Sequence, residues 1–147
     1  MRVILACDHG GYELKTLLAP AIAAMGHEVV DGGCHSEEAV DYPDYAYPAA
    51  DAVASGAADA AILICGTGIG MSLCANRVPG IRAAAVTDAD VARLSREHNN
   101  SNVLCLGGRI VDPDTALDIV RQWLTTPFSG DGRHVRRLAM VHQWEDD

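Results

Sequence analysis

The chain has 147 residues, which is enough for one domain with its own hydrophobic core. Its formal net charge of −9 argues against nucleic acid as a partner. No apolar run approaches the roughly eighteen residues that a membrane span needs, and Asp8 and His9 interrupt the apolar N-terminus too early for a signal peptide. Five cysteines without a close CxxC pair disfavour a disulfide framework or a zinc site and fit a reducing compartment. We therefore expect one cytoplasmic domain, residues 1–147, that binds neither nucleic acid nor membrane.

Short apolar runs alternate along the chain with longer segments of helical pattern. Strands are expected at Val3–Cys7, Glu28–Asp31, Ala60–Cys65, Ala83–Val86 and Val103–Leu106. Helices are expected at Tyr12–Met25, Pro43–Ser55, Gly70–Arg77, Asp88–His98, Pro113–Thr125 and Val135–Trp144. This alternation predicts an α/β fold in which helices cover both faces of a five-stranded parallel sheet. We expect the strand order 2-1-3-4-5.

Two helix starts carry capping residues. Asp112 precedes Pro113 and predicts an N-cap followed by proline at the first helical position. Thr87 and Asp90 resemble a weak capping box at the start of the preceding helix.

One stretch of the chain reads as an active site. The apolar run Ala61–Ile64 ends in Cys65, and three glycines follow within five residues before a helix begins. Backbone N–H groups and the positive end of a helix dipole stabilise an anion or a thiolate at such a turn. Glycines also let the backbone approach a ligand, because no Cβ stands in the way.

Two other interpretations of this stretch stay open. Cys65 also fits a small buried residue in a tight turn. The glycines also resemble a dinucleotide fingerprint, since Asp88 lies about twenty residues further on. The spacing is GxGxG rather than GxGxxG, however, and the turn follows the third expected strand rather than the first.

Other polar residues are expected at the two edges of the sheet. Ligands of such folds bind at the carboxyl ends of the strands, where Asp8, His9 and Arg109 follow expected strands. His98 and Asn99 follow a helix that starts at this edge and therefore ends at the opposite one. His98 thus cannot easily reach Cys65 of its own subunit, and a catalytic His98 would act on the site of a neighbouring subunit. Asp8 as a helix cap and Asn99 as a helix terminator are the simpler alternatives.

A basic cluster lies near the C-terminus. Arg133 and Arg137 are four residues apart and share one face of the last expected helix, as a phosphate clamp needs. The same pair also fits a solvated basic face.

Six ordered motifs, spread over essentially the whole chain, resemble type B ribose-5-phosphate isomerase, in the family that also holds galactose-6-phosphate isomerase. They are CDHGGYELK at 7–15, DYPDYA at 41–46, ICGTGIGMS at 64–72, SREHNNSNVL at 95–104, GGR at 107–109 and GRHVRR at 132–137. The resemblance implies a Rossmann-like three-layer αβα sandwich. It also implies a homodimer or homotetramer whose active sites are shared between subunits, without a metal or other cofactor.

The resemblance also implies roles for individual residues. Cys65 would be the base that moves a proton between C1 and C2 of the open-chain sugar, and His98 would help to open the furanose ring. Thr67 would hold the enediolate, together with the turn and helix residues Gly66, Gly68, Ile69, Gly70 and Ser72. Substrate hydroxyls and phosphate would contact Asp8, His9, Asn99, Arg109, Arg133 and Arg137, with Arg136 as the alternative if the register near 133 differs. One branch of the family uses a glutamate where this chain has Met71, which places the chain in the cysteine branch.

The sequence therefore predicts an isomerase of ribose 5-phosphate and ribulose 5-phosphate that works by thiolate-mediated proton transfer through an enediolate. Three alternatives stay open. In the first, the substrate is another sugar phosphate, such as allose 6-phosphate, galactose 6-phosphate or a tetrulose 4-phosphate. In the second, the chain is a non-catalytic sugar-phosphate sensor on the same fold. Least favoured is a flavin protein, since aromatic residues make up only 5% of the chain.

Overall fold

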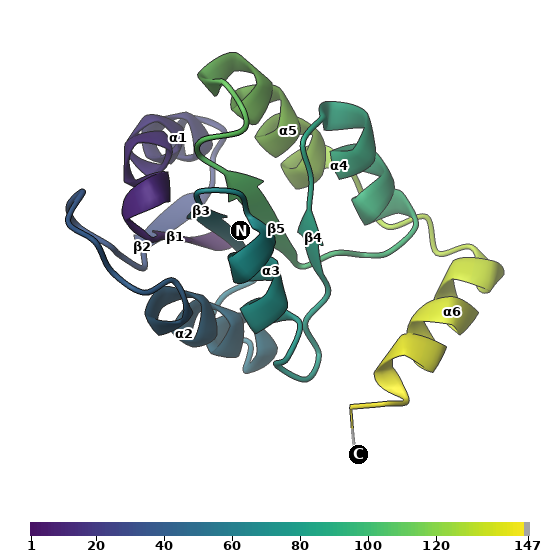
Figure 1. Cartoon of the computed structure of the whole chain (residues 1–147). Coiled ribbons are helices and arrows are strands. Elements are labelled where there is room, and N and C mark those ends of the chain that lie inside the picture. Colours follow the sequence, from purple (N-terminus) through teal and green to yellow (C-terminus); the bar gives the residue numbers. More distant parts are fainter. Residues whose placement is uncertain (146–147) are drawn as a thin grey trace.

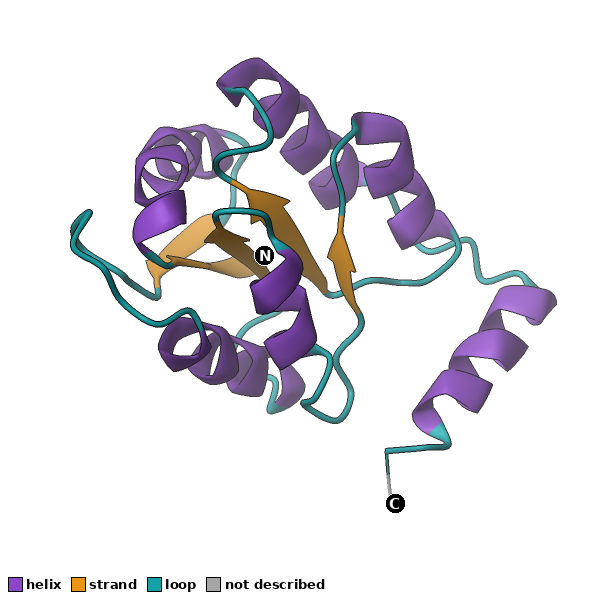
Figure 2. Ribbon diagram, in the orientation of Figure 1, coloured by secondary structure: helices purple, strands orange, loops and turns teal. Residues whose placement is uncertain are grey.

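The computed structural model describes residues 1–145, so residues 146–147 of the expected domain lie outside the described part. At its centre is a parallel five-stranded sheet with helices on both faces (Figures 1 and 2). The strands are β1 (Arg2–Cys7), β2 (Glu28–Asp31), β3 (Ala60–Cys65), β4 (Ala83–Ala85) and β5 (Val103–Gly107). Because all neighbouring strands pair in parallel, their carboxyl ends share one edge of the sheet. The predicted three-layer α/β fold is confirmed.

The strand order corrects one expectation. The sheet runs β2-β1-β3-β5-β4 instead of 2-1-3-4-5, so β5 lies inside the sheet and β4 at its edge. Burial gives the physical reason. All five residues of Val103–Gly107 are buried, as an interior strand covered on both faces requires, whereas none of the three alanines of Ala83–Ala85 is fully buried. The predicted neighbourhood of β1 and β3 is confirmed.

Helices form at all six expected places. They are α1 (Tyr12–Ala24), α2 (Pro43–Ala54), α3 (Ile69–Ala75), α4 (Ala89–Glu97), α5 (Pro113–Thr125) and α6 (Gly132–His142), with a short 3-10 turn, η1 (His9–Gly11), before α1. The main difference is α6, which begins at Gly132 rather than Val135, so that Arg133 is helical. None of the described helices is long and apolar enough to cross a membrane.

The two faces of the sheet carry separate hydrophobic cores. Alternate residues of β1, β3 and β5 point to opposite faces, so Ile62 and Leu104 join one core while Leu63 and Cys105 join the other. Helices α1, α4 and α5 cover the first core, and α2 and α3 cover the second. Helix α6 stands apart from this sandwich (Figure 1, yellow).

Helix α4 is capped differently from the expectation. The Thr87–Asp90 capping box is wrong, because the carboxylate of Asp88 accepts a hydrogen bond of 2.9 Å from the backbone N–H of Val91. Asp88 is therefore the N-cap of α4. The cap predicted at Asp112 is confirmed by a hydrogen bond of 2.8 Å from Thr115 N.

Replacing Asp88 by Ala is expected to lower the free energy of unfolding by about 1 kcal/mol, because the N–H of Val91 loses its partner. Asp90→Ala is the matched control, since it removes a carboxylate from the same helical turn without removing the cap. Urea denaturation of both variants measures the difference. Equal losses in the two variants would contradict the capping assignment.

Candidate active site

Three strand–helix turns meet at the carboxyl edge of the sheet. They follow β1, β3 and β5, and hydrogen bonds tie them together: Asp8 N to Ile64 O at 3.0 Å, and Gly108 N to Cys65 O at 2.8 Å. A Cβ on Gly108 would lie 2.4 Å from Gly10 O, and one on Gly10 would lie 3.0 Å from Gly66 N. Glycine is therefore needed for the turns to approach this closely.

The Cys65 thiol lies at the centre of this edge. It ends β3, is 4% exposed, and its Sγ accepts a hydrogen bond of 3.1 Å from the backbone N–H of Gly68. A donated N–H stabilises a sulfur atom more strongly when the sulfur is negatively charged. Helix α3 has only seven residues, so the sulfur atom is held at the start of this helix by one specific hydrogen bond more than by a long helix dipole.

The conformation of Gly68 aims its N–H at the sulfur. Its φ of +82° lies in the left-handed region, and a Cβ there would lie 3.0 Å from the carbonyl carbon of Leu106. Both facts restrict the position to glycine.

The remaining residues of the turn face the start of α3. The Thr67 side chain is exposed, and its Oγ1 accepts a hydrogen bond of 3.3 Å from Ile69 N. The Ser72 hydroxyl donates to Ile69 O at 2.7 Å, so it serves the helix itself. At Gly70 a Cβ would lie 2.6 Å from the ring of Tyr42, which therefore covers this end of α3. The sequence analysis gave Tyr42 no role, although it belongs to the DYPDYA motif.

Polar side chains also come from the neighbouring turns after β1 and β5. Asp8 is buried, and its Oδ1 accepts a hydrogen bond of 2.8 Å from Gly10 N, so the capping interpretation of Asp8 is confirmed. The Nδ1 atom of His9 accepts from Val40 N at 3.2 Å. The exposed guanidinium of Arg109 lies over Gly66. His9 and Arg109 also line a cavity of about 420 Å³ at this edge.

A second cluster forms where α4 ends and α6 begins. The rings of His98 and His134 lie 4.4 Å apart, and His134 Nδ1 lies 3.3 Å from His98 O. Arg133 Nε donates to His134 Nε2 at 3.0 Å. Burial, followed by the neighbouring His98 and Arg133, lowers the pKa of His134. The positive charge of the cluster therefore comes from Arg133, and Asn99 and Arg137 are exposed beside it.

The sequence analysis missed His134, although it stands in the GRHVRR motif. Its contact with His98 joins residues 36 positions apart, which no local pattern reveals.

The two clusters lie at opposite edges of the sheet. Cys65 pairs with Gly107 at the carboxyl end of β5, whereas His98 precedes Val103 at the amino end. The four residue steps of this strand span about 13 Å. As the direction of α4 predicts, one chain does not bring His98, Asn99, Arg133 or Arg137 to its own Cys65.

The dinucleotide interpretation needed Asp88 as the acidic residue that binds a ribose, but the Asp88 carboxylate caps α4 instead. Within residues 1–145 no group of three or more His, Cys, Asp or Glu side chains is arranged to hold a metal ion.

Comparison with known proteins identifies the family. The Ribose/Galactose Isomerase family matches residues 3–141. The chain belongs to this family. Ribose-5-phosphate isomerase B of Escherichia coli is 44% identical over 140 residues, which cover 95% of this chain and 93% of the relative.

Solved structures of the family share the fold over nearly the whole chain. Ribose-5-phosphate isomerase B of Clostridium thermocellum superposes with a TM-score of 0.97 at 50% identity, covering 99% of this chain and 98% of that structure. The enzyme of Mycoplasma genitalium, solved with bound ribulose-5-phosphate, has a TM-score of 0.94 at 38% identity and covers 99% and 97%. The resemblance inferred from the six motifs is confirmed.

Gly68→Ala is expected to destabilise this isomerase and to lower its turnover, because it strains the backbone that donates to Cys65. Gly56→Ala is the matched control: Gly56 has the same φ of +82°, but nothing lies within 4 Å of its Cβ position. The control is expected to lose about 1–2 kcal/mol from the left-handed conformation alone and to keep its turnover. Urea denaturation and an isomerase assay measure both variants. Equal stability and equal turnover would contradict the role given to Gly68.

Proposed function

We propose that this chain interconverts ribose 5-phosphate and ribulose 5-phosphate, with Cys65 as the base. The observation that carries the proposal is the buried thiol that receives the Gly68 N–H at 3.1 Å, between the turns after β1 and β5. Family membership supports the reaction class, and the Mycoplasma genitalium relative binds ribulose-5-phosphate.

The isomerisation needs one proton to move between neighbouring carbons. In the aldose-to-ketose direction, the Cys65 thiolate removes the proton from C2 of the open-chain sugar, and the electron pair forms an enediolate. The resulting thiol then returns a proton to C1, while the proton of the C2 hydroxyl passes to O1, so that C2 becomes the carbonyl carbon of the ketose. Thr67 and the backbone N–H groups of the turn that are not already donated within the chain stabilise the negative oxygen of the enediolate, as oxyanion donors do. A positioned base contributes about 10²–10⁴-fold and a good oxyanion donor about 10²–10³-fold.

A complete site takes residues from two copies of the chain. His98 opens the sugar ring, Asn99 binds a hydroxyl, and Arg133 and Arg137 bind the phosphate of a substrate held at the Cys65 of the partner. Asp8, His9 and Arg109 complete the site from the chain that carries the thiol. Three features support this proposal. The two clusters are separated within one chain, α6 lies outside the sandwich, and both α3 and the α6 region carry exposed apolar side chains.

These apolar side chains are large and exposed. Ile69 and Leu73 of α3 are 58% and 61% exposed, and Met140, Val141 and Trp144 on and after α6 are 56%, 58% and 77% exposed. Burying them against a second copy removes this apolar surface from water. We therefore propose that the chain forms a homodimer. Association of two such dimers would give a homotetramer.

The cellular setting follows from the thiols. All five cysteines are free and buried, with Cys65 reduced as its proposed role requires. We propose the cytoplasm, where thiols stay reduced, as the compartment.

Cys65→Ala is expected to lower kcat for ribose 5-phosphate about 10²–10⁴-fold with little change in KM, because the base is lost while the binding groups remain. Cys74→Ala is the matched control, since Cys74 is also buried and lies on the adjacent helix α3. Both variants are measured by steady-state kinetics with EDTA present. The substrates, tested in turn, are ribose 5-phosphate, allose 6-phosphate, galactose 6-phosphate and erythrulose 4-phosphate. Near-normal turnover by Cys65→Ala would contradict its role as base. Turnover of another sugar phosphate alone would change the substrate and keep the mechanism.

Co-expression of Cys65→Ala and His98→Ala chains tests the shared site. Each variant alone is expected to be nearly inactive. Random pairing puts half of the chains into mixed dimers, each with one intact site, so about a quarter of the wild-type activity returns. Equal expression of the two chains is checked by mass spectrometry. Absence of any restored activity would show that both groups act within one chain.

A further inference from the structure

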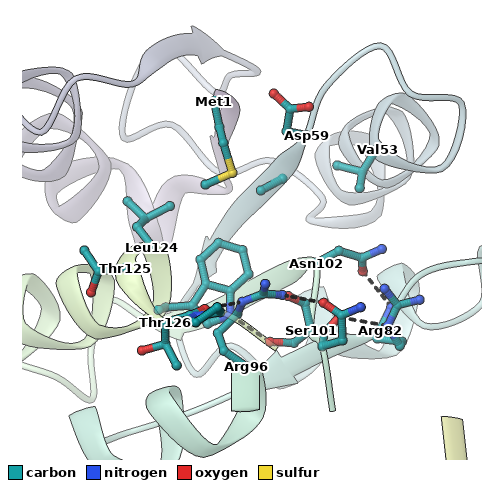
Figure 3. A pocket seen from close by; sticks show the side chains of 14 residues that line it. Met1, Val53, Asp59, Arg82, Arg96, Ser101, Asn102, Leu124, Thr125 and Thr126 are labelled. Atoms are coloured by element: carbon teal, nitrogen blue, oxygen red, sulfur yellow. Dashed lines mark hydrogen bonds between the residues drawn. The ribbon is translucent and has the colours of Figure 1, made fainter. Parts of the chain in front are cut away.

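A cavity of about 500 Å³ lies at the amino edge of the sheet, opposite the Cys65 thiol (Figure 3). Its lining residues precede or begin the strands: Met1 lies before β1, Asp59 before β3, Arg82 before β4, and Ser101 and Asn102 before β5. None of the residues proposed for catalysis or substrate binding lines it. The cavity is therefore separate from the site described above.

Two arginines form one wall of this cavity, with Met1, Asp59 and Val53 across from them (Figure 3). Asn100 holds both guanidinium groups: its backbone oxygen accepts from Arg82 Nε at 2.8 Å, and its side-chain oxygen accepts from Arg96 Nη1 at 3.1 Å. Asn100 adopts a φ of +46°, a left-handed conformation that it shares with no other non-glycine residue among residues 1–145. The N–H of Asn100 donates to Arg96 O and the N–H of Ser101 donates to Ser95 O, so this conformation ends helix α4 and places Asn100 between the two arginines.

Backbone and amide oxygens and one imidazole hold these arginines, and no carboxylate does. Arg96 also donates to the backbone oxygens of Ser101 and Thr126. Arg82 Nη1 donates to Gly80 O at 3.3 Å and lies 3.1 Å from His142 Nε2. Within the described residues neither guanidinium has a carboxylate oxygen within 4.0 Å. Glu145 is the acid that influences Arg82, and Asp59 is the acid of the opposite wall. Two half-buried positive charges thus share one cavity without direct compensation.

The same burial lowers the pKa of both arginines, and the charge of Arg82 lowers that of Arg96 further. An anion placed between them would reverse this repulsion. In the described chain, no hydrogen bond occupies Nη2 of either arginine, which leaves donors for a ligand. Arg96 is fixed further by Trp123, whose ring centroid lies 5.9 Å from its Cζ.

We propose that this cavity binds a small phosphate-bearing anion at a site distinct from the catalytic one. Guanidinium groups match the tetrahedral oxygens of a phosphate with paired hydrogen bonds, and two of them favour a dianion. The proposal also accounts for Asn100, Ser101 and Asn102 of the SREHNNSNVL motif, which the isomerase reaction does not use. It does not depend on the assignment of Cys65.

Inorganic phosphate is the first probe, and Trp123 is the reporter. The chain has two tryptophans, so Trp144→Phe leaves Trp123, which lines the cavity, as the fluorophore. In this background phosphate is expected to change the fluorescence of Trp123 saturably, and calorimetry is expected to show a binding event with the same dissociation constant beside any phosphate bound at Arg133 and Arg137. Fluorescence and heat that stay unchanged up to high millimolar phosphate would overturn the proposal.

Two variants with opposite expected effects locate the anion. Arg96→Gln is expected to weaken binding about tenfold or more, because a charged donor is lost. Asp59→Asn is expected to tighten binding about twofold to fivefold, because a nearby negative charge is removed. Arg93→Gln is the matched control on the same helix, since Arg93 pairs with Glu97 and does not line the cavity.

Asp59 is exposed, so its variant tests the proposal even if Arg96→Gln does not fold. Phosphate affinity that Asp59→Asn leaves unchanged would place the anion elsewhere and overturn the proposal. The dissociation constants of glycerol 3-phosphate and inorganic phosphate are then compared. The ligand that binds more tightly shows whether the site prefers a phosphate ester or free phosphate, and either result supports a phosphate site. If malonate, a dicarboxylate, binds more tightly than both inorganic phosphate and glycerol 3-phosphate, the proposal that the site binds a phosphate group is overturned.

Discussion

The close approach of three backbone turns at one edge of the sheet is the constraint on which the active site depends. A Cβ on Gly10 would lie 3.0 Å from Gly66 N, and one on Gly108 would lie 2.4 Å from Gly10 O. This contact fixes the turns after β1, β3 and β5 relative to one another, and with them Asp8, Cys65 and Arg109. The thiol then receives its N–H from Gly68, whose conformation a side chain would strain. These glycines therefore shape the site because the absence of a Cβ lets the turns pack closely together.

Parallel strands divide the chemistry of this chain between two edges. The carboxyl edge carries the thiol and its backbone donors, and the amino edge carries His98, the α6 arginines and the cavity of Arg82 and Arg96. A strand of ordinary length separates them by more than any side chain spans. Under the proposed function, such an enzyme completes its site when two copies associate through the apolar surfaces of α3 and α6. In that proposal, helix α6 contributes its arginines to the site of the neighbouring copy.

Local chemistry explains why much of the fold was predictable. Glu28–Asp31, Ala60–Cys65 and Pro113–Thr125 have the bounds that their patterns indicate, because short apolar runs and the Asp112–Pro113 cap act over a few residues. The cap of α4 was misjudged because Thr87, Asp88 and Asp90 all offer side-chain oxygens at nearly the same place. Only the path of the backbone into the helix selects Asp88 among them.

The sequence by itself determined the fold class, the family, and the turns that carry the thiol, since each depends on residue types at short, fixed spacings. Tertiary structure decided what depends on contacts between distant segments. It placed β5 inside the sheet and β4 at its edge, because the larger apolar side chains of β5 gain more from burial on both faces than the three alanines of β4 do. It brought His134 to His98, Tyr42 to Gly70, and the charges of Arg82 and Arg96 into one cavity through Asn100. No pattern along the chain encodes these contacts, because they form only when the packed helices set the paths of the loops between them.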